Sequence, residues 1–163
     1  MPEAQAAELL SACCGSARWV KAMLARRPFG CRDALLSAAD EIWESLGSDD
    51  WREAFAHHPR IGQRHSALPQ HERGQAWSAG EQEAIDSAGD AVRQDLAAAN
   101  REYEKRFGFI YVVCATGKTA EELLALARQR LATSPDQELA VAAAEQQKIT
   151  RLRLEKLLRA DGR

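Results

Sequence analysis

Apolar residues recur along most of this chain at the spacing of an α-helix. The N-terminal part shows the pattern in Leu9, Leu10 and Cys13, then in Trp19, Val20, Met23 and Leu24. Residues three and four positions apart lie on one face of a helix, so each run gives its helix one apolar face. Alanine, leucine, glutamate and arginine dominate the composition. The sequence therefore predicts an all-α fold.

Three segments carry the residues that start a helix. Ser48–Asp50 stand directly before Trp51, while Thr119–Glu122 and Ser134–Gln137 have the spacing of a capping box. Pro135 occupies the favoured first position of a helix. Together with the periodicity, these signals predict helices over residues 4–14, 16–26, 31–46, 50–57, 79–106, 119–132 and 136–159.

The length of the chain suits one domain. A chain of 163 residues can bury roughly 70% of its unfolded surface around a single core. No internal repeat and no low-complexity linker divides it, so we expect one multi-helix bundle over residues 1–163. The longest irregular stretch, residues 59–77, is of a length that is usually functional or mobile in a compact domain.

The segment Phe109–Val113 conflicts with the helical pattern. It is rich in aromatic and β-branched residues, which favour extended structure, but the chain has no second convincing strand to pair with it. Its backbone donors and acceptors need partners, and unpaired amides beside a cavity can bind a polar ligand. The two interpretations left open are an extended loop that lines an active site and a buried turn of helix.

The charge of the chain limits the partners that it can have. Charged residues make up 28% of the sequence and nearly cancel, which leaves a formal net charge of −2. No overall positive field favours binding to nucleic acid or to an anionic membrane, so we expect neither. A partner must then be recognised locally, as a small molecule is.

Cysteine usage points to a reducing compartment. The chain has no C-x-x-C spacing, and the adjacent Cys13 and Cys14 are poorly placed for an ordinary disulfide framework. No N-terminal leader pattern and no apolar run of about 20 residues is present. We therefore expect a cytoplasmic protein with reduced thiols, and we expect the adjacent pair to be exposed.

His58 is the first candidate for a chemical role. Proline restricts the residue before it to non-helical backbone, so His58, followed by Pro59, is expected near a helix end. Its imidazole can exchange protons near neutral pH if it faces a ligand. A purely structural, hydrogen-bonded histidine at a helix end remains the alternative.

Four histidines lie close together in sequence, at positions 57, 58, 65 and 71. None of the pairs has the i, i+4 spacing of a helical H-E-x-x-H zinc motif, and the region is loop-like. We therefore predict no metal site.

The segment Ser78–Gln82 has two interpretations. Ser78 and Glu81 have the spacing of a capping box, in which both side chains would satisfy backbone amides. Glu81 and Gln82 also place a carboxylate next to an amide, a pair that suits a ureido or imide ligand.

Arg153 is expected to face the interior. On a helical projection it lies between Ile149 and Leu157, whereas Arg151 points nearly the opposite way. A buried guanidinium needs an anionic partner. Glu145, on a similar face of the same helix, is a structural candidate, and a ligand carboxylate is the other.

Four motifs, taken in order, resemble one family. They are Leu9–Val20, His58–Gly62, Ser78–Gln82 and Phe107–Thr119. This ordered set is similar to that of 2-oxo-4-hydroxy-4-carboxy-5-ureidoimidazoline (OHCU) decarboxylase, and the resemblance extends over nearly the whole chain. It implies an all-α, single-domain protein, commonly a homodimer, with no metal or organic cofactor.

The resemblance also implies an activity, the decarboxylation of OHCU to (S)-allantoin and CO2 as the last step from urate to allantoin. His58 would donate a proton, and Glu81 would either hold His58 in the required protonation state or bind ureido N–H groups. Arg153 matches the family's functional arginine better than Arg151 does. The substrate-binding set implied is Pro59, Ser78, Ala79, Gly80, Glu81, Gln82, Phe109, Ile110, Tyr111, Val112, Val113 and Arg153.

Two other classes of function compete with this one. A non-catalytic helical interaction module would use the same histidines and arginine structurally. A metal hydrolase would use the histidine cluster. A folded but inert protein would favour the first, and sensitivity to a chelator would favour the second.

Overall fold

The computed structural model describes residues 1–61 and 88–160, and the fold is given for these two ranges. Their helices are α1 (Glu3–Cys13), α2 (Ala17–Ala25), α3 (Arg32–Ser45), α4 (Ser48–Ala56), α7 (Asp90–Phe107), α8 (Ala120–Arg130) and α9 (Pro135–Ala160). No strand occurs within either range. The prediction of an all-α fold is confirmed for this part of the chain.

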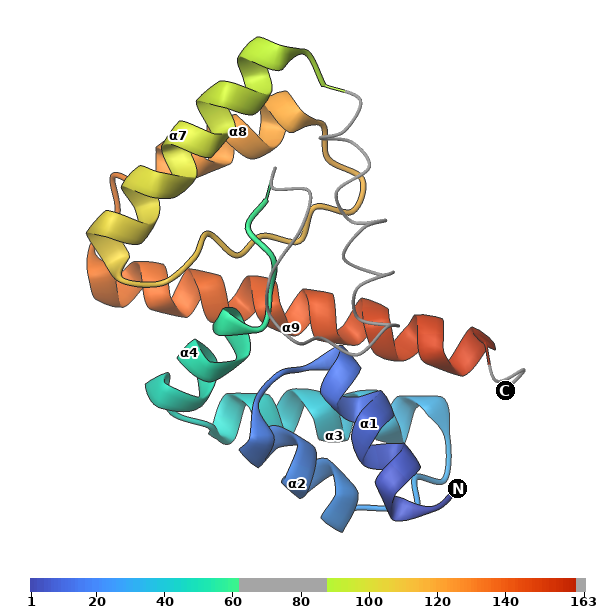
Figure 1. The fold of residues 1–163 in the computed structure, drawn as a ribbon. Coiled ribbons are helices and arrows are strands. Elements are labelled where there is room, and N and C mark those ends of the chain that lie inside the picture. Colours follow the sequence, from blue (N-terminus) through green and yellow to red (C-terminus); the bar gives the residue numbers. More distant parts are fainter. Residues whose placement is uncertain (62–87, 161–163) are drawn as a thin grey trace.

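Helix α9 runs through the middle of the structure (Figure 1). On one side of it lie α1, α2, α3 and α4, of which α1, α3 and α4 pack directly against α9. On the other side α7 and α8 pack against each other as a pair. The long helix therefore joins two groups of helices.

Local signals explain where several helices begin. At α8 the Thr119 hydroxyl accepts a hydrogen bond from the Glu122 amide, and the Glu122 carboxylate accepts one from the Thr119 amide. This is the predicted capping box. Helix α9 begins at Pro135, one residue before the predicted range 136–159 but at the residue expected to favour a helix start. Helix α4 begins two residues earlier than predicted, because Asp50 lies in its first turn and accepts from the amide of Gly47.

The prediction of one continuous helix over residues 79–106 is wrong. Ala88 is not helical, and Gly89 has extended backbone as the residue before α7. Glycine weakens a helix interior but suits the residue before its first turn. At the other end, Gly108 adopts the left-handed conformation with φ of 75°, which favours glycine and ends α7.

Two tryptophans tie neighbouring helices together through their indole N–H groups. Trp19 donates to the carbonyl of Ala39 at 3.1 Å, and Trp43 donates to that of Ala143 at 3.0 Å. These bonds link α2 to α3 and α3 to α9. Each side chain therefore fills core volume and also satisfies its polar atom.

The segment that leads from α7 to α8 crosses the molecule beside α9 (Figure 1). Phe109–Val113 is extended there rather than helical, so the alternative of a buried helix turn is wrong. Four of its five side chains are buried, and Ile110 is partly exposed. Between described residues, no backbone-to-backbone hydrogen bond involves this segment.

Side chains hold the backbone of this segment in place instead. The Arg130 guanidinium donates to the Val112 carbonyl at 2.7 Å, and the Glu145 carboxylate accepts from the Cys114 amide at 2.8 Å. Lys148 also donates to Glu145. Burial alone would raise the pKa of Glu145, but these two donors outweigh it and hold that pKa below its ordinary value.

A buried ion pair completes this arrangement. Arg130 donates to the Glu138 carboxylate at 2.7 Å, and the Tyr103 hydroxyl donates to the same carboxylate. Arg130 and Glu138 are 8% and 0% exposed in their side chains. Tyr103, Arg130 and Glu138 belong to α7, α8 and α9, so this cluster joins all three helices and the extended segment.

Replacing Arg130 by Met is expected to destabilise the protein by about 3–5 kcal/mol, because it leaves the Glu138 carboxylate buried without its cation. Urea denaturation measures the change. Arg128→Met is the matched control: Arg128 pairs with Asp95, but these side chains are 60% and 57% exposed. Loss of that surface pair is expected to cost no more than about 1 kcal/mol. Equal, small losses in both variants would show that the buried cluster does not stabilise the fold.

Candidate functional site

His58 lies just beyond the C-terminal end of α4. That helix ends at Ala56, and the amide of His58 donates to the carbonyl of Phe55 at 3.0 Å, which closes a last turn. The prediction that His58 stands near a helix end is confirmed. This turn directs the imidazole toward α9, against which α4 packs.

The partner of His58 is Gln146, in the middle of α9. The imidazole Nε2 and the Gln146 side-chain oxygen are 2.6 Å apart, and Gln146 is 0% exposed. Gln146 is not among the site residues predicted from the sequence. Helical spacing could have indicated it, because Gln146, Ile149 and Arg153 share one face of α9. Its partner, 88 positions earlier in the chain, could not have been found in this way.

The surroundings of His58 favour its neutral form. The pKa of His58 is lowered from 6.5 to about 3, chiefly by burial and also by Arg153 and His57, while the hydrogen bond with Gln146 acts in the opposite direction. At neutral pH the folded protein therefore holds a neutral imidazole here. Such a group can accept a proton before it gives one back.

Arg153 is buried, as the helical projection predicts. It is 6% exposed and donates to the carbonyl of Ala12, at the end of α1, at 3.3 Å. Arg151 is exposed and donates to Asp40 at 2.7 Å on the surface. Glu145, the structural partner considered for Arg153, is bound instead by Lys148 and the Cys114 amide. The helix thus separates the two arginines as the helical projection predicts.

Two thiols lie next to this arginine. Cys13 and Cys14 are buried rather than exposed, so the expectation for this pair is wrong. Cys13 ends α1 as part of its apolar face, and Cys14 follows it into the core. The pKa of each thiol is raised to about 12, because burial outweighs the nearby Arg153 charge, which acts to lower it. Both thiols therefore stay protonated and unreactive.

Gly15 brings the turn between α1 and α2 against the histidines. A Cβ atom at position 15 would lie 2.4 Å from Cγ and 2.5 Å from Cβ of His57. These distances are far below van der Waals contact, and the atoms involved are at the base of the His57 side chain. Only glycine permits this approach of the turn to the end of α4.

The extended segment meets α4 through an aromatic contact. The rings of Phe55 and Phe109 have their centroids 5.3 Å apart, and the Arg52 guanidinium lies over the Phe109 ring at 5.2 Å. Phe55 lies on α4, three residues before His58. The structure therefore places the start of the segment beside the element that carries His58.

Part of the predicted site lies outside the described residues. This holds for Ser78, Ala79, Gly80, Glu81 and Gln82, and for His65 and His71 of the histidine cluster. Within residues 1–61 and 88–160, no three His, Cys, Asp or Glu side chains are grouped so that they could hold a metal ion. Nor does any helix in these ranges have the length and apolar character needed to cross a bilayer.

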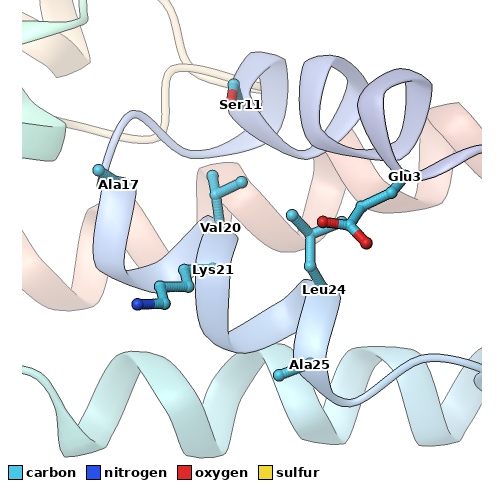
Figure 2. A pocket seen from close by; sticks show the side chains of 7 residues that line it. All are labelled: Glu3, Ser11, Ala17, Val20, Lys21, Leu24 and Ala25. Atoms are coloured by element: carbon cyan, nitrogen blue, oxygen red, sulfur yellow. The ribbon is translucent and has the colours of Figure 1, made fainter.

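A surface hollow of about 440 Å³ between α1 and α2 lies apart from these residues. Figure 2 shows that Val20 and Leu24 point from α2 toward α1, while Lys21 points away from them. None of the predicted site residues lines this hollow. The candidate site is therefore the group around the half-buried His58 and the buried Arg153.

The fold and this group define a class: a protein of α-helices in its described residues, whose long helix α9 carries a buried arginine and contacts a neutral histidine, with an extended aromatic segment beside it. The sequence model of the OHCU decarboxylase family matches residues 1–155. The chain belongs to this family.

Two curated relatives show the extent of the similarity. The "Uric acid degradation bifunctional protein TTL" of Arabidopsis thaliana is 36% identical over 145 residues, which cover 89% of this chain and 45% of that protein. The chain thus spans less than half of the plant relative's length. The "2-oxo-4-hydroxy-4-carboxy-5-ureidoimidazoline decarboxylase" of Amia calva is 33% identical over 135 residues, 81% of this chain and 75% of that protein.

Solved structures agree. A crystal structure of OHCU decarboxylase in the presence of (S)-allantoin is 35% identical, with a TM-score of 0.79, and the match covers 92% of this chain and 96% of that one. A crystal structure of (S)-allantoin synthase is 23% identical, with a TM-score of 0.68. That match covers 96% of this chain and 50% of the chain in that structure. The second similarity concerns the fold alone.

The low pKa of His58 predicts a stability that depends on pH. Between pH 3 and 6.5 the unfolded chain binds a proton at His58 that the folded protein does not. The free energy of unfolding therefore decreases as the pH falls through this window, by up to about 1.4 kcal/mol per pH unit from this group. In His58→Asn, urea denaturation between about pH 4 and pH 6 is expected to show a correspondingly smaller slope. The same slope in both proteins would contradict the shift.

Proposed function

We propose that this protein decarboxylates OHCU to (S)-allantoin and CO2, the last step from urate to allantoin. One observation carries the proposal: α4 and α9 bring the half-buried His58 near the charge of the buried Arg153, in a chain that belongs to the OHCU decarboxylase family. The Amia calva relative bears the name of this activity, and (S)-allantoin is present in the related crystal structure.

The chemistry of the substrate needs no external electron acceptor. Its name places a hydroxyl and a carboxyl on one ring carbon, C4, and a ureido group on the next, C5. When the bond from C4 to the carboxylate breaks and CO2 leaves, the electron pair forms a double bond between C4 and C5, and a ring nitrogen becomes protonated. The C4 hydroxyl then loses its proton to become a carbonyl, and C5 gains one. The heterocycle itself is the electron sink.

His58 is proposed to make the final proton transfer stereoselective. As a neutral imidazole it accepts the proton of the C4 hydroxyl, and the imidazolium then donates a proton to one face of C5. This transfer sets the S configuration, whereas proton delivery from solvent to either face gives a racemate. A positioned imidazole therefore explains the use of an enzyme even where the substrate also decays alone.

Arg153 is proposed to bind a substrate oxygen or to orient Glu81. Its buried guanidinium is a strong donor to an anionic oxygen. Backbone groups of Phe109–Val113 are proposed to bind the ring. These backbone groups make no backbone-to-backbone hydrogen bond with other described residues. The buried Arg130 side chain holds the segment at the Val112 carbonyl.

The remaining assignments rest on the family resemblance. We propose that Pro59 lines the pocket and that Ser78–Gln82 contact the substrate, with Glu81 and Gln82 as its main polar ligands. We propose that Glu81 either holds the protonation state of His58 or binds ureido N–H groups. No metal or organic cofactor takes part in this scheme.

We further propose that the chain acts as one domain, as a homodimer in the cytoplasm. Its four free cysteines support a reducing compartment, and the family resemblance supports the dimer. Light scattering of the purified protein is expected to give twice the 18.0 kDa of the chain. A mass of one chain at working concentrations would contradict the dimer.

Circular dichroism at the allantoin band tests the activity. Purified protein is added to urate with urate oxidase and 5-hydroxyisourate hydrolase, and the (S)-allantoin signal is expected to appear fast. His58→Asn is expected to lose about 10²- to 10⁴-fold in rate, the usual contribution of a general acid or base. Arg153→Met is expected to lose about 10²-fold, as on removing a donor to a reacting oxygen.

Arg151→Met is the matched control, because that arginine lies two residues away on α9 and bonds to Asp40 at the surface. It is expected to stay within about twofold of the unmodified protein. If the unmodified protein is folded but gives only the slow racemic signal, the interaction module is favoured. Full activity of His58→Asn would remove this residue from the mechanism.

A further inference from the structure

Gln146 connects His58 to a second buried group. Its side-chain oxygen lies 2.6 Å from His58 Nε2, and its amide nitrogen donates to the Thr150 hydroxyl at 3.1 Å. Gln146 and Thr150 are 0% and 5% exposed, and they lie one turn apart on α9. The oxygen and the nitrogen of the Gln146 amide thus each have a hydrogen-bond partner.

The orientation of this amide determines where the histidine carries its proton. A carbonyl oxygen can only accept, so a neutral His58 facing the Gln146 oxygen must have its hydrogen on Nε2. The lone pair is then on Nδ1. If the amide were turned over, its NH₂ group would face His58 and would require the lone pair on Nε2 instead. Thr150 also has a side-chain hydrogen bond with Cys14 that acts to lower the pKa of this thiol, as a donated hydroxyl hydrogen does. With its hydrogen directed to that sulfur, the Thr150 oxygen accepts from the Gln146 NH₂ group, which favours the first orientation.

We propose that Gln146, oriented by Thr150, is a positioning residue that holds His58 as the Nε2–H tautomer, so that Nδ1 is the atom that exchanges protons with the substrate. The part concerning substrate rests on the proposed function. The assignment of the tautomer does not rest on the proposed function, because it depends on contacts within the protein alone.

Charges near the imidazole do not supply this selection. Among described residues, the charged or titratable groups that act on His58 are Arg153 from α9 and His57 from its own segment. Both oppose a positive imidazole as a whole. The 2.6 Å contact with Gln146 acts on one nitrogen only, so it distinguishes Nε2 from Nδ1.

Nuclear magnetic resonance of protein labelled with ¹⁵N-histidine tests the tautomer. The chain has four histidines, and the signals missing in His58→Asn assign those of His58. The expected result at neutral pH is the Nε2–H form, with a ring N–H proton visible because a hydrogen bond slows its exchange with water. The Nδ1–H form in the unmodified protein would overturn the proposal.

Gln146→Met keeps the length of the side chain and removes its acceptor. The protected N–H signal of His58 is expected to disappear in this variant. Gln147→Met is the control, since this neighbouring residue donates to Glu44 at 3.3 Å on the outside of α9. That variant is expected to keep the signal. A protected signal that survives in Gln146→Met would overturn the proposal.

Kinetics separate positioning from simple packing. Gln146→Met is expected to lower kcat about 10- to 100-fold, less than the loss of His58 itself, because the imidazole remains but is no longer fixed. KM is expected to change by less than about threefold, since uniform substrate binding is untouched. A kcat within twofold of the unmodified protein, with the N–H signal lost, would show that the contact does not serve the reaction.

Thr150 provides a second pair of variants if Gln146→Met folds poorly. Thr150→Val removes the hydroxyl that orients the amide and is expected to weaken both the N–H signal and kcat. Thr150→Ser keeps the hydroxyl and is expected to restore both. If the unmodified protein shows the Nε2–H form but makes no (S)-allantoin, the proposed function fails and the tautomer assignment stands. Equal behaviour of the Val and Ser variants would overturn the role of Thr150.

Discussion

The buried face of α9 carries polar side chains, and each of them needs a partner away from water. Glu138 receives Arg130 and Tyr103, Gln146 receives His58, and Arg153 reaches the end of α1. These partners come from α1, α7, α8 and the turn after α4. An apolar helix at this place could slide or rotate with little loss. The polar face of α9 instead specifies which atoms of the surrounding elements must meet it.

The sequence predicted the helices well and the tertiary contacts only in part. Periodicity and capping signals located α8 and α9, and the projection of α9 turned Arg153 inward. The predicted helix over residues 79–106 was wrong at Gly89. The helical pattern of apolar residues continues across this glycine, and propensity alone does not show at which glycine a helix is interrupted. The importance of Gln146 depends on His58, which is brought to it only by the packing of α4 against α9. Such a contact has no signature in local spacing.

The arginine and the histidine are coupled through charge. The guanidinium of Arg153 contributes to keeping His58 neutral while the site holds no anion. Under the proposed function, an anionic substrate next to Arg153 offsets that charge and makes the imidazolium less costly to form. The proton acceptor would therefore gain basicity when substrate is bound. This coupling lets the imidazole stay neutral in the empty site and take up a proton once the anion is bound.

The close approach at Gly15 also constrains how this part of the chain can vary. Position 15 and position 57 share a space that holds one imidazole and no additional methyl group. Among related chains, a larger residue at position 15 is then compatible only with a smaller or differently directed side chain at position 57. The two positions, 42 residues apart in sequence, should therefore change together, and a change at one alone would move the end of α4 on which His58 depends.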